Sequence, residues 1–150
     1  MIAVTGASGA LGRLVIDRLP ARADVVAIVR DPARAPDGVR IRHGDYNDPA
    51  SLRQAFDGVT RLLLISSPEL DPALRIGHHR AAVAAAGDVA VGAIAYTSFL
   101  GAGTGATGVT EAHHATEQAI FDSGLPYTIL RHPYYSVISG GGVAGQAIIT

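Results

Sequence analysis

The most informative chemistry in the sequence lies in a glycine-rich segment near the N-terminus. Gly6, Gly9 and Gly12 recur every third residue, after a β-branched run at residues 2–5 and before an apolar-periodic run that reaches Leu19. A strand that turns through glycines into a helix lets the backbone approach a phosphate, and the N–H groups at the helix start attract the anion. The spacing differs from Gly-x-Gly-x-x-Gly and any tight turn could use glycine, but this context favours a dinucleotide pyrophosphate site. The residues assigned to it are Gly6, Ala7, Ser8, Gly9, Ala10, Leu11 and Gly12.

An arginine follows the next predicted strand. Residues 25–29 form a continuous apolar run, typical of a strand buried on both faces of a parallel sheet, and Arg30 comes directly after it. Roughly 20 residues past such a glycine loop, an acidic residue would accept from the ribose 2′-hydroxyl, whereas an arginine would pair with a 2′-phosphate. Arg30 therefore predicts NADPH as the cofactor. Asp31 keeps NADH open, and a solvated arginine at a strand end is the structural alternative.

An aspartate follows the strand predicted at residues 39–43, nearer the sheet edge. Asp48 and Pro49 have the residue types of an N-cap and a first helical position, so the preceding Asp45 is not needed to begin that helix. At the carboxyl end of a strand, Asp45 could contact the adenine of a cofactor. Its alternative role is to stabilise the turn through its own backbone.

Small polar residues also follow two later strands, predicted at residues 61–65 and 89–96. Ligands of open α/β sheets bind beyond the carboxyl ends of the strands, and small hydroxyl side chains allow a cofactor to lie close to the backbone. These positions are therefore further candidates for cofactor binding. They are Ser66, Ser67, Glu69 and Thr97.

An alanine-rich helix is predicted over residues 72–86, ending at Gly87, and it carries adjacent histidines. His78 and His79 cannot share one helix face, and no third ligand stands nearby, so we predict no metal site. We expect these histidines to be solvated or to cap the backbone.

A second predicted helix begins with Thr110 as its cap and ends at Gly124. It places His113 and Glu117 four residues apart on one face. The loop before it, residues 101–108, contains four glycines, so it is expected to be either a mobile lid beside the cofactor or a surface connection.

Composition excludes several classes of function. The chain has 150 residues, 48% apolar and 17% charged, with a formal charge of −1, so nothing favours nucleic acid or an anionic membrane as a partner. It has no cysteine, and all 12 basic residues are arginine, which removes thiolate chemistry and a lysine base together. The first predicted strand begins at Met1 and no apolar run is long enough to span a membrane, so we expect a cytoplasmic protein.

Six strands with intervening helices predict an α/β fold with a doubly wound parallel sheet. The sixth strand is expected at residues 126–131. No repeat or linker divides the chain, so we predict one dinucleotide-binding domain over residues 1–136. Residues 137–150 form a divergent, glycine-rich tail.

Five segments together resemble the NmrA-like branch of the atypical short-chain dehydrogenases/reductases, and within it the NADPH-dependent quinone oxidoreductase type. They are residues 6–12, 28–32, 62–67, 95–98 and 127–131. The resemblance implies an NAD(P)-binding Rossmann fold, NADPH bound by the first loop, by Arg30 and by residues 66–69, and two-electron reduction of quinones or similar small electrophiles. Members of that branch continue beyond the length of this chain, so the resemblance also implies that a C-terminal portion with much of the substrate pocket is missing.

The tyrosine and lysine dyad of typical short-chain dehydrogenases is absent, which argues against alcohol dehydrogenase chemistry. A quinone that accepts hydride yields a stabilised phenolate that water can protonate, so positioning suffices. Ser98, His113 and Tyr135 are the residues we expect beside the quinone oxygens. Two alternatives stay open: a non-catalytic NADP-binding redox sensor of the NmrA-like type, and an inactive fragment of a longer reductase. A homodimer is also open.

Overall fold

The computed structural model describes residues 1–20, 23–103, 105–133 and 148–149, in which strands and helices alternate as predicted. The strands are β1 (Ile2–Val4), β2 (Val25–Val29), β3 (Arg40–His43), β4 (Arg61–Leu64), β5 (Ile94–Phe99), β6 (Tyr127–His132) and β7 (Ile148–Ile149). The helices are α1 (Ala10–Arg18), α2 (Pro49–Phe56), α3 (Pro72–Asp88) and α4 (Val109–Asp122), with a short 3₁₀ helix, η1 (Pro32–Arg34).

All of these strands belong to one sheet, in the order β3-β2-β1-β4-β5-β6-β7. Strands β1 to β6 are parallel to one another, and β7 pairs antiparallel with β6. The chain moves outward from β1 to β3, then returns to the other side of β1 with β4. This reversal is the topological switch point of a doubly wound dinucleotide-binding fold, which confirms the predicted fold class.

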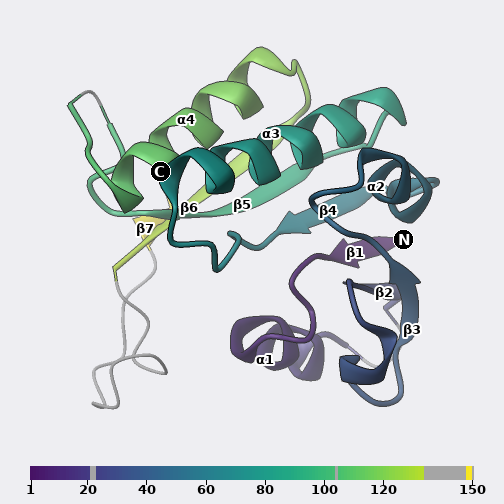
Figure 1. The fold of residues 1–150 in the computed structure, drawn as a ribbon. Helices are drawn as coiled ribbons and strands as arrows, with labels where there is room; N and C mark the ends of the chain where they lie inside the picture. The colour runs from purple at the N-terminus through teal and green to yellow at the C-terminus, as the bar shows by residue number, and fades with distance from the viewer. Residues whose placement is uncertain (21–22, 104, 134–147, 150) are drawn as a thin grey trace.

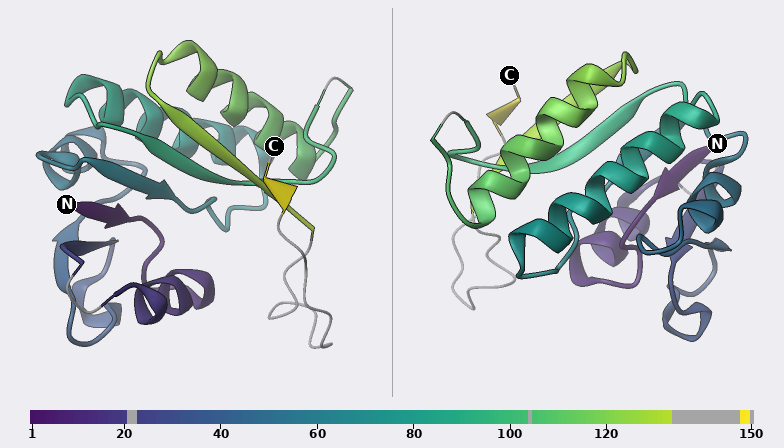
Figure 2. Two further views of the ribbon diagram at one scale, coloured as in Figure 1. Left: turned by 180° about the vertical axis from the view of Figure 1, so that it is seen from behind. Right: turned by 45° about the horizontal axis from the view of Figure 1, so that its top comes forward.

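The helices form layers on both faces of the sheet. Helices α2, α3 and α4 cover one face, and α1 lies on the other (Figure 1, Figure 2). The larger core cluster lies under α2, α3 and α4, and Phe56, Leu62 and Ile120 are fully buried there. A smaller cluster on the α1 side packs Ile16 against Val29. Burial on both faces explains why the central strands are continuous apolar runs.

Two helices begin as their sequences indicate. The Asp48 side chain accepts from the backbone N–H groups of the first turn of α2, and Asp71 does the same for α3. A proline follows each of these caps, where its missing N–H costs nothing. The two helices pack against each other, and α2 also packs against β3.

The end of α3 and the start of β5 differ from the prediction. The helix continues through Gly87 to Asp88, and Ala90 then takes a left-handed conformation with φ of 53°. The apolar run from Val89 was wrongly assigned to the strand, which begins only at Ile94. Residue Val91 is buried all the same, because the connection packs into the core. Hydrophobicity therefore predicted burial there but not backbone conformation.

The start of α4 and the presence of β7 also differ from the prediction. Gly108, not Thr110, is the N-cap of α4, and the Thr110 hydroxyl instead bonds the backbone N–H and carbonyl of Thr107 from inside the helix. Strand β7 was not predicted, because its two residues carry no periodic signal of their own.

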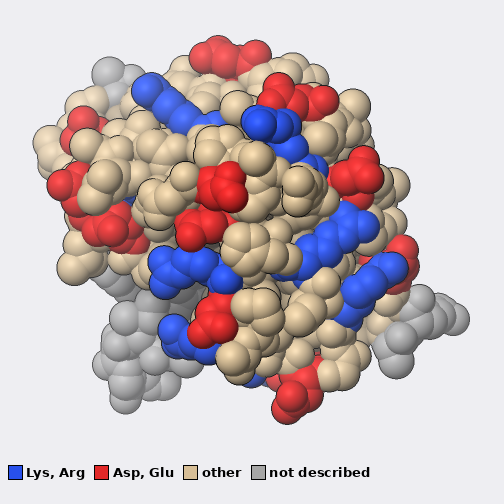
Figure 3. All heavy atoms as spheres, turned by 45° about the vertical axis from the view of Figure 1, so that its right-hand side comes forward, with Lys and Arg blue, Asp and Glu red and all other residues tan. Residues whose placement is uncertain are grey.

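Acidic and basic side chains are interspersed on the face shown in Figure 3, which agrees with a formal charge of −1. Among the residues that the structure describes, none belongs to a helix long and apolar enough to cross a membrane.

Candidate functional site

A cavity of about 550 Å³ opens at the carboxyl ends of β1, β2 and β4. Its walls are the glycine segment at residues 6–12, Arg30 after β2, the turn at residues 44–47 and the loop at residues 65–69. Helices α3 and α4 add Arg75, His78 and His113 from the far side. The cavity therefore lies beside the switch point, where open α/β sheets bind their ligands.

Each of the three glycines in the loop is required for a different structural reason. Gly6 has φ of +59°, a left-handed conformation that side chains disfavour. Gly9 lines the cavity as the N-cap of α1, with no side-chain cap, so the first N–H groups of the helix are left for a ligand. Gly12 packs α1 onto the turn at residues 6–7 with no room for a side chain. Ala7 is buried in the smaller core cluster and does not line the cavity.

Two arginines stand at the rim beyond β2. Arg30 is exposed, lines the cavity and forms no ion pair with any residue in the described ranges. Arg34 also lines the cavity, and its carbonyl oxygen accepts a 2.6 Å hydrogen bond from Arg13 Nη2. The Asp31 carboxylate accepts from the Ala33 N–H at the start of η1. A polyanionic group at this rim would therefore meet two guanidinium groups, while the neighbouring carboxylate is engaged with backbone.

The loop after β4 is held by side chains from two elements, β5 and α3. The Ser66 N–H donates to Thr97 Oγ1 (2.9 Å), and the Ser67 N–H donates to His79 Nε2 (2.8 Å). Arg75 donates from Nε to the Ser67 carbonyl oxygen (2.8 Å), with a second bond from Nη2. Both backbone groups of Ser67 are thus fixed by α3, which rigidifies the cavity wall.

A second set of contacts ties this loop to the turn after β3. His78 lies between them: Nδ1 is 3.0 Å from Ser67 Oγ and Nε2 is 3.1 Å from Asn47 Oδ1. The Tyr46 ring stacks on His78, and its hydroxyl is 3.0 Å from Thr5 Oγ1. Burial raises the pKa of Tyr46 to about 12, so this hydroxyl stays protonated and acts as a donor.

A buried polar network extends behind the cavity. Tyr96 and His113 share a 2.7 Å hydrogen bond between the hydroxyl and Nδ1. Burial, with the charge of Arg75 second, lowers the pKa of His113 to about 4. Burial and neighbouring cationic groups lower that of His79 to about 3. Both imidazoles are therefore neutral at pH 7.

The acidic part of the network lies deeper. Glu117 is 1% exposed and accepts from Ser98 Oγ (2.5 Å) and from Arg131 Nε (3.0 Å) and Nη2 (2.6 Å). The bidentate pair with Arg131 joins α4 to β6, and the hydrogen bond from Ser98 joins α4 to β5. A carboxylate engaged by three donors is suited to holding these elements together rather than to exchanging protons.

The structure brings most of the predicted site residues together. Eleven of the thirteen cofactor candidates line the cavity: Gly6, Ser8, Gly9, Ala10, Leu11, Gly12, Arg30, Asp45, Ser66, Ser67 and Glu69. Ala7 and Thr97 lie behind the wall that they support. Asp45 also accepts from the Asn47 N–H, so the turn-stabilising role weighed for it is present beside its place on the cavity.

The three residues expected beside the quinone oxygens have different outcomes. His113 lines the cavity, whereas Ser98 is buried against Glu117 and does not. Tyr135 lies outside the described residues. No described residue of the loop at 101–108 lines the cavity, and the choice between lid and surface connection stays open.

Sequence reasoning missed the contribution of α3. Of the two roles expected for His79, solvation was wrong, because the side chain is fully buried, whereas the capping role is present, because Nε2 accepts from the Ser67 backbone N–H. His79 also bonds Thr116, which was not predicted. His78 and Arg75, which line the cavity, were also not assigned to the site. The sequence signal available was limited to spacing: Arg75 and His79 are four residues apart, which places them on one face of the helix but does not show which loop that face contacts.

Comparison with known proteins identifies the family. A family model described as NAD(P)H-binding matches residues 6–144. The chain is 46% identical, over 91% of its length, to quinone oxidoreductase 2 of Escherichia coli strain K12, and covers 49% of that protein. The chain thus spans about half the length of the curated relatives that it matches.

Solved structures agree with this relationship. The triphenylmethane reductase of Citrobacter sp. in complex with NADP(H) superposes with a TM-score of 0.87 and 44% identity, over 93% of this chain and 51% of that one. The E. coli NADPH-dependent quinone oxidoreductase in complex with NADPH gives a TM-score of 0.83 and 44% identity, over 91% of this chain and 50% of that one. The predicted resemblance is confirmed, and this chain belongs to the NAD(P)H-binding family.

Proposed function

We propose that this chain binds NADPH in the cavity and supports hydride transfer to a quinone or a similar small electrophile. The observation that carries the proposal is the cavity itself, which combines an uncapped helix start, free guanidinium groups beyond β2 and a fixed loop after β4. Relatives with 44 to 46% identity that are named NADPH-dependent quinone or triphenylmethane reductases support the same assignment.

Each wall of the cavity suits one part of NADPH. The N–H groups at the start of α1 would bind the pyrophosphate. Arg30 and Arg34 would pair with the 2′-phosphate, for which a planar guanidinium provides two donors. The turn at residues 44–47 would lie beside the adenine, and residues 66–69 beside the nicotinamide half. NADPH, when bound, supplies the hydride.

The residues near the far end of the cavity favour an electrophile that needs no strong acid. The neutral His113 imidazole cannot supply a proton as an imidazolium at pH 7, because its pKa lies near 4. Tyr46 and Tyr96 hold their protons even more strongly, since burial raises both pKa values. A quinone can be reduced without a strong side-chain acid, because its reduced oxygen is a phenolate that solvent can protonate.

The test measures binding and turnover separately. Titration with NADPH followed by fluorescence should give saturable binding, and addition of menadione should then oxidise NADPH catalytically. Binding without turnover, with menadione and with a triphenylmethane dye, would contradict the reductase and favour a redox sensor or an inactive fragment. Failure to bind NADPH in a chain that melts cooperatively would overturn the proposal as a whole.

A further inference from the structure

The hydrogen bonds behind the cavity have a direction that can be worked out from one backbone group. The Ser67 N–H can only donate, and its acceptor is His79 Nε2 at 2.8 Å. That nitrogen therefore carries a lone pair, and the neutral His79 ring must carry its hydrogen on Nδ1. Nδ1 faces Thr116 Oγ1 at 2.7 Å, and Thr116 gives its own hydrogen to the Ala112 carbonyl oxygen at 2.7 Å. The Thr116 hydroxyl is therefore the acceptor of the His79 hydrogen.

The direction continues through Tyr96. Its hydroxyl lies 3.4 Å from His79 Nδ1 and 2.7 Å from His113 Nδ1. Since His79 Nδ1 already bears a hydrogen, Tyr96 cannot donate to it. The Tyr96 hydroxyl also interacts with the side chains of Thr116 and Ser66. We assign its single hydrogen to the short 2.7 Å contact with His113 Nδ1, which makes that nitrogen the acceptor. The neutral His113 ring consequently carries its hydrogen on Nε2.

His113 Nε2 is open to the cavity. His113 lines the cavity, and within the described part of the chain Nε2 has no hydrogen-bond partner. Every buried side-chain nitrogen and oxygen there does have a partner, so Nε2 is not enclosed. The ring is held in place by the Phe99 ring, stacked at a centroid distance of 5.9 Å, and by Tyr96.

We propose that the series of hydrogen bonds from Ser67 through His79, Thr116 and Tyr96 fixes His113 as a hydrogen-bond donor, with Nε2–H directed at an acceptor oxygen of the ligand. This inference rests on the proposed function for the identity of that oxygen, which is a quinone carbonyl oxygen. Tyr96 acts as a positioning residue through His113. A fixed donor suits an oxygen that gains negative charge during reduction, and it disfavours ligands that present an N–H or O–H at this point.

The first arm of the test reads the tautomers by NMR of ¹⁵N-labelled protein. At pH 7 we expect His113 to show a protonated Nε2 and an unprotonated Nδ1, and His79 to show the reverse. A Tyr96→Phe protein should lose this preference, with His113 Nδ1 becoming partly protonated. Tyr127→Phe, the same change at an exposed tyrosine of β6, is the control and should leave both rings unchanged. A protonated His113 Nδ1 in the parent chain would overturn the proposal whether or not the variant folds.

The second arm adds menadione to the complex with NADP⁺, in which no hydride is available. The Nε2 hydrogen of His113 should move downfield on binding, and Tyr96→Phe should weaken menadione binding by about 2- to 12-fold, the range of one hydrogen bond. If the tautomers are as predicted but the His113 signal does not respond to menadione, the hydrogen-bond directions stand and the assignment of the ligand as a quinone is contradicted. If the tautomers are unchanged in Tyr96→Phe, Tyr96 does not set the tautomer of His113.

Discussion

Gly12 lies against the carbonyl of Gly6, and a Cβ atom at Gly12 would sit 2.4 Å from that oxygen. The equivalent atom at Gly9 would lie 3.3 Å from the same oxygen, a contact that a small shift relieves. The two glycines are therefore needed for different reasons. Gly12 lets α1 close onto the turn, whereas Gly9 leaves space for a ligand.

This difference predicts opposite results for two variants. Gly12→Ala should lower the free energy of unfolding by about 1–3 kcal/mol, as overpacking does, measured by urea denaturation. Gly9→Val should unfold at nearly the parent urea concentration but lose NADPH binding, because its side chain fills the pyrophosphate space. Parent NADPH affinity in a folded Gly9→Val protein would exclude this loop as the phosphate site.

Arg30 should determine the choice between the two nicotinamide cofactors. Its charge-assisted bonds to a 2′-phosphate, reduced by screening at an exposed rim, predict tighter binding of NADPH than NADH by roughly 10- to 100-fold. Arg30→Asp should reverse the preference by repelling the phosphate and accepting from the ribose hydroxyl. The measurement is a pair of titrations at one fixed salt concentration.

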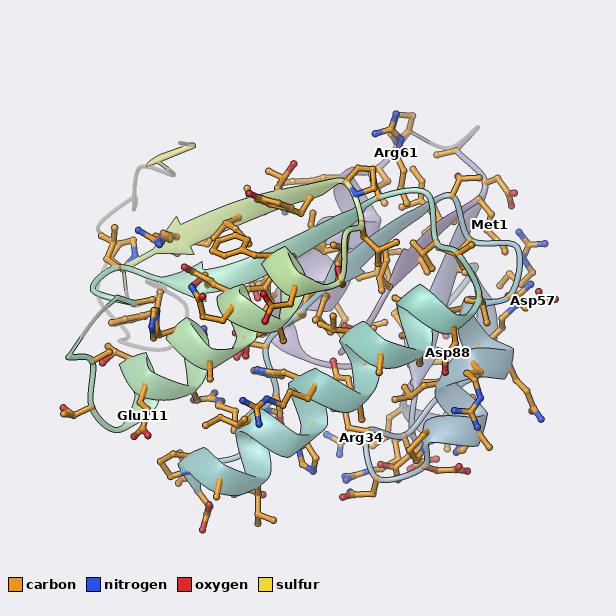
Figure 4. All side chains as sticks on the ribbon, turned by 90° about the horizontal axis from the view of Figure 1, so that it is seen from above. Met1, Arg34, Asp57, Arg61, Asp88 and Glu111 are labelled. Carbon is orange, nitrogen blue, oxygen red and sulfur yellow. The ribbon has the colours of Figure 1, made fainter. Side chains whose placement is uncertain are left out.

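A matched control exists at the amino ends of the parallel strands, opposite the end where the cavity opens. Arg61 lies near Met1, where the parallel strands begin (Figure 4), and Arg61→Asp makes the same change of charge far from the cavity. It should leave the NADPH preference intact. An equal affinity of the parent chain for both cofactors would show that Arg30 does not contact the 2′-phosphate.

The Glu117 carboxylate should contribute substantially to stability. Glu117→Gln replaces one of the two carboxylate oxygens with an amide N–H₂ group, which faces an Arg131 donor whichever oxygen it replaces. We expect a loss of about 2–3 kcal/mol, below the full cost of breaking a buried pair because the Arg131 side chain is 40% exposed and can be solvated. The exposed pair Arg53–Asp88 is the control, and Arg53→Gln should cost less than about 1 kcal/mol. Equal losses in the two variants would mean that the buried network adds nothing.

The buried histidine His79 should make the fold sensitive to acid. Its folded pKa of about 3 lies below the unfolded value of about 6.5, so between these values the unfolded chain binds more protons than the folded one. The free energy of unfolding therefore decreases as the pH is lowered through this range. The contribution is complete above about pH 6.5 and decreases by up to about 1.4 kcal/mol per pH unit below it. His79→Gln keeps an acceptor for the Ser67 N–H and should flatten this dependence between about pH 6.5 and pH 4, measured by urea denaturation. His43→Gln, at an exposed position, should not; a parent-like slope in His79→Gln would contradict the assignment.

Loss of His113 should slow quinone reduction only moderately. A neutral donor to the quinone oxygen assists the reaction, but no obligatory side-chain acid is required. We expect His113→Ala to retain turnover with menadione, with kcat/KM reduced by about 10- to 100-fold, measured by NADPH oxidation. A loss of about 10³-fold or more would identify His113 as a true general acid.

The fold and much of the candidate site could be predicted because their signals are local. Gly6, Arg30 and Ser66 each follow a buried strand directly, and the carboxyl ends of parallel strands meet at one edge of the sheet. The role of His79 could not be predicted in this way. Its burial depends on the packing of α3 against α4 and on a backbone N–H of a separate loop, and neither contact is encoded in the residues beside it.

The position of β1 inside the sheet has a consequence for how the protein folds. Ile2 pairs with Val25 on one side and with Arg61 on the other, so β1 is synthesised before both of the strands that it pairs with. Such non-local parallel pairing raises the contact order and slows folding. Until β4 emerges from the ribosome, one edge of β1 has no partner, and the short length of this strand, three residues, limits its exposure to wrong pairing.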